Sequence, residues 1–258
     1  MATLVSAFFD INREHNGDGR KIEEYLEWMK KTLQLNARLY IVTEKRFIPF
    51  ILEHRPSHYP TVIKEETLED AKYYKYKDQM VRILQDDAYK KRMQHSGRVE
   101  CILPEYNIIQ YSKFGWLEKA IEENPFDTSY FFWIDIGISR FFLDVDVSVP
   151  YPGLSIYPKT DKFIIQEDYK LKHYPIDENY VWKSDNLLKG TMFGGTKEIV
   201  LSVSKELEDI FKQEMLEKGT LNNEQFGLTL LWKRDPSLFQ IVDDYKGPFL
   251  ILFKLLSL

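Results

Sequence analysis

The sequence of 258 residues predicts an α/β fold built around a mostly parallel sheet, and three observations lead to this prediction. Short apolar segments alternate with helical patterns along the first 65 residues, which is typical of βαβ units. The segments Leu4–Phe9 and Tyr130–Ile134 are almost entirely apolar, with Ser6 as the exception in the first, as expected of strands that are buried on both faces. The chain has no internal repeat, low-complexity tract or Ser- and Gly-rich linker, which favours a single domain.

The first half of the chain has the clearer pattern. The run Leu4–Phe9 has the length of a strand, and the turn-rich segment Asn16–Gly19 follows it. Apolar residues recur every three or four positions from Ile22 to Leu33, which predicts an amphipathic helix. By the same criteria we expect strands over 37–43 and 61–63, a short helix over 47–52, and one or two exposed helices within 64–98.

The second half begins with a long helical pattern over 105–123 that ends at Pro125. It leads to Tyr130–Ile134, the most hydrophobic strand of the chain. Prolines make 145–190 irregular, with short apolar pieces such as 163–165 between them. We expect 191–196 to precede a helix over 198–218, for which Gly219 is a suitable C′ residue. A helix over 226–233 and a strand over 238–242 complete the prediction.

Composition excludes several classes of protein. Lys and Arg number 35 against 40 Asp and Glu, so the formal charge of −5 argues against a general nucleic-acid binder. Aromatic residues make up 15% of the chain, which excludes a disordered protein. Cys101 is the single cysteine and forms no internal disulfide, so we expect a reducing, cytoplasmic environment. No run reaches the length of a membrane span, but the apolar tail Pro248–Leu258 suggests peripheral contact with the inner face of a membrane.

Asp135 is the first residue that points to chemistry. It directly follows the strand Tyr130–Ile134, where a carboxylate is costly unless it faces a crevice. In open α/β sheets, ligands bind at the carboxyl ends of the strands. Gly137 allows a tight turn and the close approach of a ligand, and Arg140 adds a fixed positive charge. A simple ion pair between Asp135 and Arg140 is the alternative interpretation.

Five short segments occur in the order in which one protein family has them. They are Leu4–Arg13, Tyr111-Ser112-Lys113, the run Phe-Phe-Trp-Ile-Asp-Ile-Gly at 131–137, Phe193–Thr196, and Asn223-Glu224-Gln225. On these motifs most of the chain resembles the HtrL/YibB family, which is found in bacterial glycan-assembly loci. The resemblance implies a GT-A-like fold, that is, a Rossmann-type three-layer α/β sandwich with a mostly parallel central sheet.

The resemblance also implies an activity and an organisation. It implies a glycosyltransferase that moves a sugar from a nucleotide-sugar donor to a hydroxyl of a glycan or lipid-linked glycan, such as lipopolysaccharide. A single domain over 1–258 would have a nucleotide-binding half at about 1–137 and an acceptor-side half at about 138–258. Two alternatives stay open. One is a nucleotidyltransferase, although the chain lacks a Gly-rich loop after the first strand. The other is a non-catalytic glycan-binding or scaffold protein on a degenerate transferase fold.

A divalent metal is expected from the chemistry of such a donor. Breaking the bond between sugar and phosphate places charge on the leaving oxygen, which a metal or fixed Lys and Arg side chains must stabilise. Mn²⁺ and Mg²⁺ prefer carboxylate ligands, and Asp135 is the candidate. Proteins with the GT-A fold usually present Asp-x-Asp, whereas this chain has Asp135-Ile136-Gly137. The alternative is Asp144-Val145-Asp146, although its alternation favours a half-exposed strand.

Other candidates for donor binding lie near the first strand and in the long helix. We expect Phe9, Asp10 and Arg13 to contact the nucleotide, with Arg13 binding a phosphate or stacking on a base. Asp10 would accept a hydrogen bond from a ribose hydroxyl or a base, and a loop ion pair is the alternative for both charged residues. Lys113 would direct its ammonium at the diphosphate, or else be a surface lysine whose stem lies on apolar neighbours.

The late motifs supply candidates on the sugar and acceptor side. Gly194, Gly195 and Thr196 resemble the sugar-facing loop of GT-A enzymes, with a turn and a helix cap as the alternatives. Glu224 is expected at the reacting centre, as the general base of an inverting enzyme or beneath the sugar in a retaining one. Gln225 would contact sugar hydroxyls. A Glu that is merely favoured at a helix N-terminus is the alternative.

Overall fold

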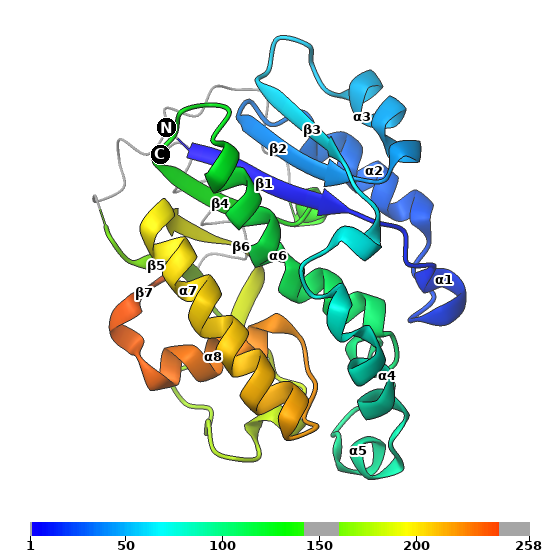
Figure 1. Cartoon of the computed structure of the whole chain (residues 1–258), viewed down its shortest axis with the longest axis vertical. Coiled ribbons are helices and arrows are strands. Elements are labelled where there is room, and N and C mark those ends of the chain that lie inside the picture. Colours follow the sequence, from blue (N-terminus) through cyan, green and yellow to red (C-terminus); the bar gives the residue numbers. More distant parts are fainter. Residues whose placement is uncertain (1, 142–159, 243–258) are drawn as a thin grey trace.

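The structure, a computed structural model, describes residues 2–141 and 160–242. Within these residues, seven strands form one sheet in the order β3-β2-β1-β4-β6-β5-β7 (Figure 1). The strands are β1 (Ala2–Phe8), β2 (Arg38–Thr43), β3 (Thr61–Glu65), β4 (Tyr130–Ile134), β5 (Phe163–Glu167), β6 (Leu188–Thr196) and β7 (Phe239–Val242). Strand β6 runs antiparallel to its neighbours β4 and β5, and the other strand pairs are parallel. The predicted α/β class with a mostly parallel central sheet is therefore confirmed.

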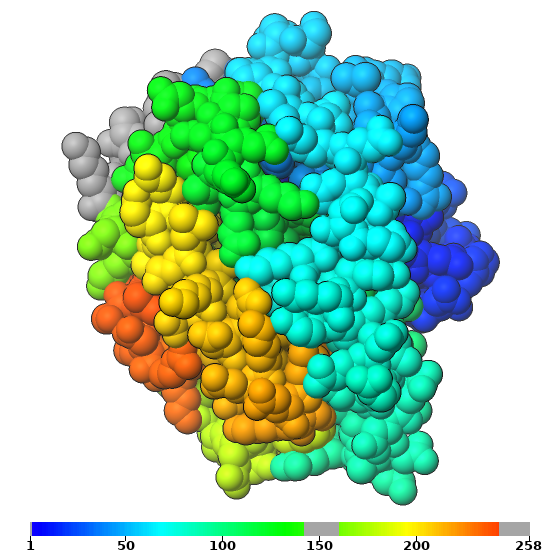
Figure 2. All heavy atoms as spheres, in the orientation of Figure 1, coloured from blue at the N-terminus to red at the C-terminus, as the bar shows by residue number. Residues whose placement is uncertain are grey.

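Helices cover both faces of this sheet and complete the three layers. They are α1 (Arg13–Asn16), α2 (Ile22–Thr32), α3 (Ile48–His54), α4 (Lys77–Gln85), α5 (Asp87–Arg92), α6 (Pro104–Glu123), α7 (Lys197–Ile210) and α8 (Glu224–Arg234). Helices α2 and α3 pack on one face, whereas α4 to α8 pack on the other. In Figure 2 the side chains of α6, α7 and the 61–92 segment together cover the sheet on the face that is seen.

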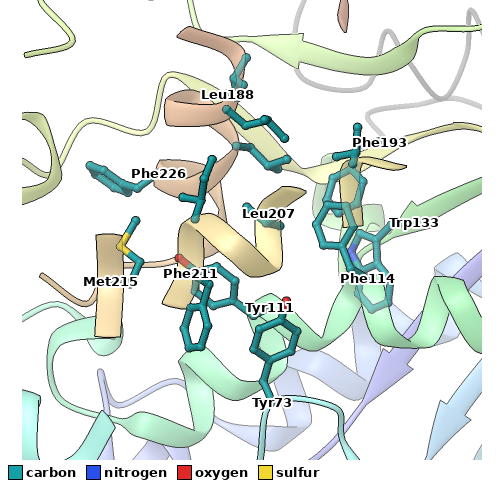
Figure 3. Close-up of a cluster of buried hydrophobic side chains, with 14 of the residues drawn as sticks. Tyr73, Tyr111, Phe114, Trp133, Leu188, Phe193, Leu207, Phe211, Met215 and Phe226 are labelled. Carbon is teal, nitrogen blue, oxygen red and sulfur yellow. The ribbon is translucent and has the colours of Figure 1, made fainter. Parts of the chain in front are cut away.

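The strand β4 shows how the sequence divides the core between the two faces. Phe131 and Trp133 point to the cluster under α6 and α7, while Phe132 and Ile134 point to the cluster under α2 and α3. A strand buried on both faces needs this unbroken apolar run, and each such side chain contributes roughly 1.5–3 kcal/mol when fully buried. Figure 3 shows the larger cluster, in which Phe114 of α6 stacks on Phe193 of β6 with ring centroids 5.0 Å apart.

Strand β6 is the main difference from the prediction. The sequence pattern predicts that 191–196 precedes a helix, but it does not predict a strand there. Gly194 pairs with Phe132 of β4 on one side and with Ile164 of β5 on the other. A Cβ at position 194 would lie 2.1 Å from the carbonyl oxygen of Phe131, so glycine is needed for the close approach of the strands. Because glycine has a low intrinsic strand propensity, the sequence pattern hides a strand that tertiary packing specifies.

The helical segment after β6 also differs in detail. The regular helix α7 ends at Ile210, and a π-helix continues it over Phe211–Glu217, where a single helix over 198–218 is predicted. Gly219 then takes the left-handed conformation, with φ 62°, that its predicted role after the helix requires.

Two further predictions concern membranes. None of the helices that the structure describes combines the length and the hydrophobicity that a membrane span requires. The apolar tail Pro248–Leu258, on which peripheral contact with a membrane is predicted, lies outside the described residues. That contact therefore stays a prediction.

Candidate active site at the crevice between strands β1 and β4

The order of the strands creates a crevice between β1 and β4. The chain runs from β1 to β2 and β3 on one side of β1, and then returns to place β4 on the other side. The helix α2, which follows β1, packs on one face of the sheet, while α6, which precedes β4, packs on the opposite face. At such a switch point the connections diverge, and open α/β sheets bind their ligands there, at the carboxyl ends of the strands.

A cavity lies at this position. It is an open crevice, and its empty space of about 850 Å³ includes volume that is open to solvent. The segments after β1 and β4 line it, together with one face of α6 and the start of α2. Six of the predicted site residues meet in its lining: Phe9, Asp10, Arg13, Lys113, Asp135 and Arg140.

Lys113 connects the two predicted acids. Its ammonium lies 3.1 Å from Oδ1 of Asp135 and 2.8 Å from Oε1 of Glu224. It also donates a hydrogen bond of 3.0 Å to the carbonyl oxygen of Gly190. The side chain of Asp135 is 28% exposed, whereas those of Lys113 and Glu224 are 2% and 0% exposed. Asp135 therefore faces the cavity, and Glu224 supports Lys113 from within the protein.

Burial controls the ionisation of this group. It raises the pKa of Glu224 to about 7, although the neighbouring Lys113 ammonium acts in the opposite direction. Burial alone would lower the pKa of Lys113, but the charges of Asp135 and Glu224 outweigh it and raise that pKa. Oε2 of Glu224 is buried and has no hydrogen-bond partner among residues 2–141 and 160–242. Lys113 thus stays charged at neutral pH, whereas Glu224 gains or loses its proton near neutral pH.

Buried amide side chains fix the position of Glu224. The Asn222 amide donates to the carbonyl oxygen of Val181 at 2.9 Å. Oδ1 of Asn223 accepts a backbone N–H and so caps α8, which begins at Glu224. The hydroxyl of Tyr111 donates to the carbonyl oxygen of Asn222 at 3.0 Å and ties this turn to α6. The Asn-Asn-Glu sequence therefore builds the turn that brings Glu224 to Lys113.

Gly190 of β6 makes room for this arrangement. A Cβ at position 190 would lie 2.1 Å from Oε1 of Glu224 and 3.0 Å from Cγ of Gln225. Because backbone and carboxylate approach so closely, the carbonyl oxygen of Gly190 can accept from Lys113. A larger residue at 190 would displace Glu224 from the ammonium.

The residues after β1 make ion pairs and also line the cavity. Nε of Arg13 donates to Oδ1 of Asp18 at 3.0 Å, and its guanidinium lies over the ring of Tyr106 at 5.0 Å. Oδ2 of Asp10 lies 3.3 Å from Arg46. Arg13 and Asp10 therefore form loop ion pairs, which is the alternative interpretation of these two residues. Contact of these two residues with a nucleotide stays a prediction.

Two other residues of the lining are held by aromatic contacts. Phe9 is almost fully buried and stacks on Trp116, with ring centroids 5.3 Å apart. Arg140 lies with its guanidinium carbon 5.4 Å from the ring centroid of Trp28. The alternative ion pair between Asp135 and Arg140 is not formed in the part of the chain that the structure describes, because Asp135 pairs with Lys113.

The other predicted residues lie away from the lining. Gly194 and Gly195 are inside β6, and a Cβ at position 195 would lie 2.6 Å from Ile199. Thr196 caps α7, with its hydroxyl accepting from the backbone N–H of Ile199, which is the predicted alternative. Gln225 follows Glu224 on α8 and does not reach the cavity lining. The sugar contacts of these residues stay predictions.

The divalent metal also stays a prediction. Oδ1 of Asp135 already accepts from the indole N–H of Trp133 at 2.8 Å and pairs with Lys113. Among the described residues, no three acidic, His or Cys side chains gather as metal ligands. The residues at hand therefore do not fit a divalent metal site. The second acidic pair, Asp144 and Asp146, lies outside the described ranges.

Sequence reasoning missed several residues of the lining, among them Arg20, Tyr25, Tyr106 and Gln110. Tyr106 and Gln110 lie seven and three positions before Lys113 in the same helix, so all three share one face of α6. This spacing is a signal that could have found them. Arg20 follows the Asn16–Gly19 turn, and no local pattern marks it.

The structure is that of an α/β protein with a crevice at the switch point of an open sheet, the position at which proteins of this class bind ligands. The chain belongs to the HtrL_YibB family, whose model matches residues 1–257 and is described as a bacterial protein of unknown function. The predicted family is therefore confirmed. No protein with curated annotation matches the sequence significantly.

The chain is also similar to a solved structure, that of mouse xyloside xylosyltransferase 1 in its apo form. The two share 12% sequence identity with a TM-score of 0.45. The similarity covers 95% of this chain and 86% of the mouse chain.

Proposed function

We propose that this protein is a glycosyltransferase that transfers a sugar from a nucleotide-sugar donor to a hydroxyl of a glycan or lipid-linked glycan. One observation carries the proposal: Asp135 is half-exposed in a cavity at the switch point, and a buried ammonium holds it there. The buried side chains of Lys113 and Glu224 beside it both have raised pKa values, and shifted pKa values are typical of catalytic sites.

The charge of the cavity supports an anionic donor. Four cationic side chains line it (Arg13, Arg20, Lys113 and Arg140), against two carboxylates (Asp10 and Asp135). A nucleotide sugar brings a diphosphate, and the reaction adds charge to it. The bond from sugar C1 to the diphosphate oxygen breaks with its electron pair on that oxygen. The acceptor oxygen bonds to C1 and its proton is released with the nucleoside diphosphate. Fixed cations stabilise the charge that develops on the leaving group.

The two acids have different roles in this proposal. Asp135 faces the cavity and is the carboxylate placed to touch the substrate. Glu224 is fully buried and is a positioning residue, because it acts through the ammonium of Lys113. We further propose a cytoplasmic location, which the single buried and unpaired Cys101 supports.

The test is an assay of nucleotide release. The protein is incubated with UDP-, GDP- and CMP-sugars, with and without Mn²⁺ and a glycan acceptor, and the free nucleotide is quantified. We expect release by the wild type and a loss of about 100-fold in Asp135→Asn, the size expected when a group that stabilises the transition state is removed. Asp78→Asn on α4 is the matched control, because Asp78 is exposed and outside the cavity lining.

Two results would count against the proposal. Absence of both binding and release with millimolar nucleotide sugars would overturn it. Binding of a glycan without turnover, unchanged in Asp135→Asn, would support the non-catalytic alternative instead.

A further inference from the structure

Two arginines from distant segments of the cavity lining converge on one tryptophan. The guanidinium carbon of Arg20 lies 5.7 Å from the ring centroid of Trp28, and that of Arg140 lies 5.4 Å from it. The two guanidinium carbons are therefore at most about 11 Å apart. Both arginines line the cavity.

The platform under these arginines is built into the fold. The hydroxyl of Ser139 donates to the carbonyl oxygen of Trp28 at 2.6 Å, which ties the segment after β4 to α2. Gly137 lies against the indole, where a Cβ would meet Cε3 of Trp28 at 3.2 Å. The tight Asp135–Arg140 turn therefore places Arg140 beside Trp28, the ring that Arg20 also contacts.

Neither of these arginines has a carboxylate partner within residues 2–141 and 160–242. Arg13 is different, because Asp18 accepts hydrogen bonds from both its Nε and its Nη2. Arg20 donates a long hydrogen bond of 3.5 Å to the hydroxyl of Tyr25. Its charge adds to the hydrogen bond and charge of Arg13 in lowering the pKa of Asp18, without an ion pair between Arg20 and Asp18. Two positive charges that share one aromatic ring repel each other, and a cation–π contact at such a site is worth only about 0.5–1 kcal/mol.

The other charged group of the lining is built around Lys113. There the single ammonium of Lys113 faces the carboxylates of both Asp135 and Glu224. Lys113 is thus charged but already paired within the protein. Among the described residues, Arg20 and Arg140 are therefore the cations of the lining that have no ion-pair partner, while Asp135 is a half-exposed carboxylate of the same lining.

We infer that Arg20 and Arg140, held on Trp28, form the subsite for the diphosphate of the donor. Two guanidinium groups match the two negative charges of a diphosphate, and their planar donors suit its oxygens. The sugar would then extend toward Asp135. Because the protein supplies both positive charges, the diphosphate is bound without a divalent cation. That the anion is the diphosphate of a nucleotide sugar rests on the proposed function.

The experiment measures nucleotide binding by calorimetry at low salt in the presence of EDTA. UDP, GDP, CDP and ADP are titrated into the protein, and the tightest of them is compared with its monophosphate and with inorganic pyrophosphate. We expect Arg20→Met and Arg140→Met each to weaken binding of the diphosphate about 10-fold, the size of one lost charged hydrogen bond. Binding of the monophosphate should weaken less, and Mn²⁺ should change the wild-type affinity by less than about 3-fold, well below the effect of one lost charged hydrogen bond.

A matched control distinguishes a local effect from a general one. Arg92 lies over the ring of Trp182 at 4.3 Å and does not line this cavity, so Arg92→Met removes the same kind of contact elsewhere. It should leave nucleotide binding unchanged. Thermal melting shows that each variant is folded, and Arg140→Lys should recover part of the lost affinity.

Each other outcome has a definite meaning. Diphosphate binding that needs Mn²⁺ and ignores both arginines overturns the inference, while release of nucleotide from a nucleotide sugar would still support the proposed function. Arginine-dependent binding of pyrophosphate without any nucleoside diphosphate would assign the subsite to a phosphorylated acceptor and overturn the donor assignment. If no phosphate compound binds and no nucleotide is released, both proposals fail.

Discussion

The ammonium of Lys113 and the carboxylate of Glu224 form an ion pair 2.8 Å apart in which neither side chain is more than 2% exposed. A buried ion pair is seldom the most stable way to fill a core, because both charges lose their hydration. Its value here is positional, since the same ammonium reaches Asp135 at the cavity. The pair links a residue of α8 to the carboxylate at the end of β4.

Replacing Lys113 by Met should lower the free energy of unfolding by about 3–5 kcal/mol, because two carboxylates then lose their buried countercharge. The double variant Lys113→Met with Glu224→Gln should be more stable than the single Lys113→Met variant, since Glu224 no longer carries a charge. Urea unfolding at pH 8, where Glu224 is ionised in the wild type, measures both effects.

Lys119→Met is the control for this prediction. Lys119 lies on the same helix and pairs with Glu66 at 2.7 Å, but its side chain is 40% exposed. Its replacement should cost less than about 1 kcal/mol. Equal losses in Lys113→Met and Lys119→Met would show that the Lys113 pair is solvated.

The raised pKa of Glu224 predicts a dependence of stability on pH. Burial raises that pKa from an ordinary value of 4.5 to about 7. Between pH 4.5 and pH 7, the folded state therefore keeps a proton on Glu224 that the unfolded state has lost. The contribution of Glu224 to stability is therefore complete below pH 4.5 and is lost as the pH rises to about 7. The total change is on the order of 3 kcal/mol.

The measurement for this prediction is the difference in unfolding free energy between the wild type and Glu224→Gln across the same pH range. Because glutamine does not titrate, the difference isolates Glu224, and the wild type should lose stability relative to the variant as the pH rises. A constant difference would place the pKa of Glu224 near its ordinary value.

Much of the fold was accessible from the sequence because its strands are short, continuous apolar runs. The apolar runs identified two buried strands, Leu4–Phe9 and Tyr130–Ile134. Because Asp135 directly follows Tyr130–Ile134, it could be predicted to lie in a crevice. β6 could not be found, because Gly190, Gly194 and Gly195 serve close packing between segments far apart in the chain.

Predictions about single side chains succeeded where the signal was local and failed where it depended on tertiary packing. Lys113 and Asp135 were found through short motifs and strand ends, which are local features. The burial of Glu224 behind Lys113 depends on how α8 packs on α6, and the convergence of Arg20 and Arg140 depends on Trp28 of α2. Such relationships are set by tertiary structure and leave no periodic signal in the sequence.

Gly190→Ala should disturb the charged group directly. The added methyl would lie 2.1 Å from Oε1 of Glu224, so either the strand or the carboxylate must move. We expect a loss of stability of about 1–3 kcal/mol, as for other overpacked cores, and a lower rate of nucleotide release. Gly97→Ala is the matched control, because its methyl would meet nothing within 4 Å. If both variants behave alike in unfolding and in turnover, the contact between β6 and Glu224 is looser than the structure has it.

Gly194→Ala separates two interpretations of the Phe-Gly-Gly-Thr motif. In the structure its methyl would lie 2.1 Å from the carbonyl oxygen of Phe131, so the strands β4 and β6 would be forced apart. Stability should fall by at least about 1–3 kcal/mol, whereas nucleotide-sugar affinity, measured at a temperature where the variant is folded, should stay close to that of the wild type. Calorimetric titration alongside thermal melting tests both expectations. A folded variant that has lost its affinity for the donor would instead assign the motif to the sugar, as its resemblance to a sugar-facing loop implies.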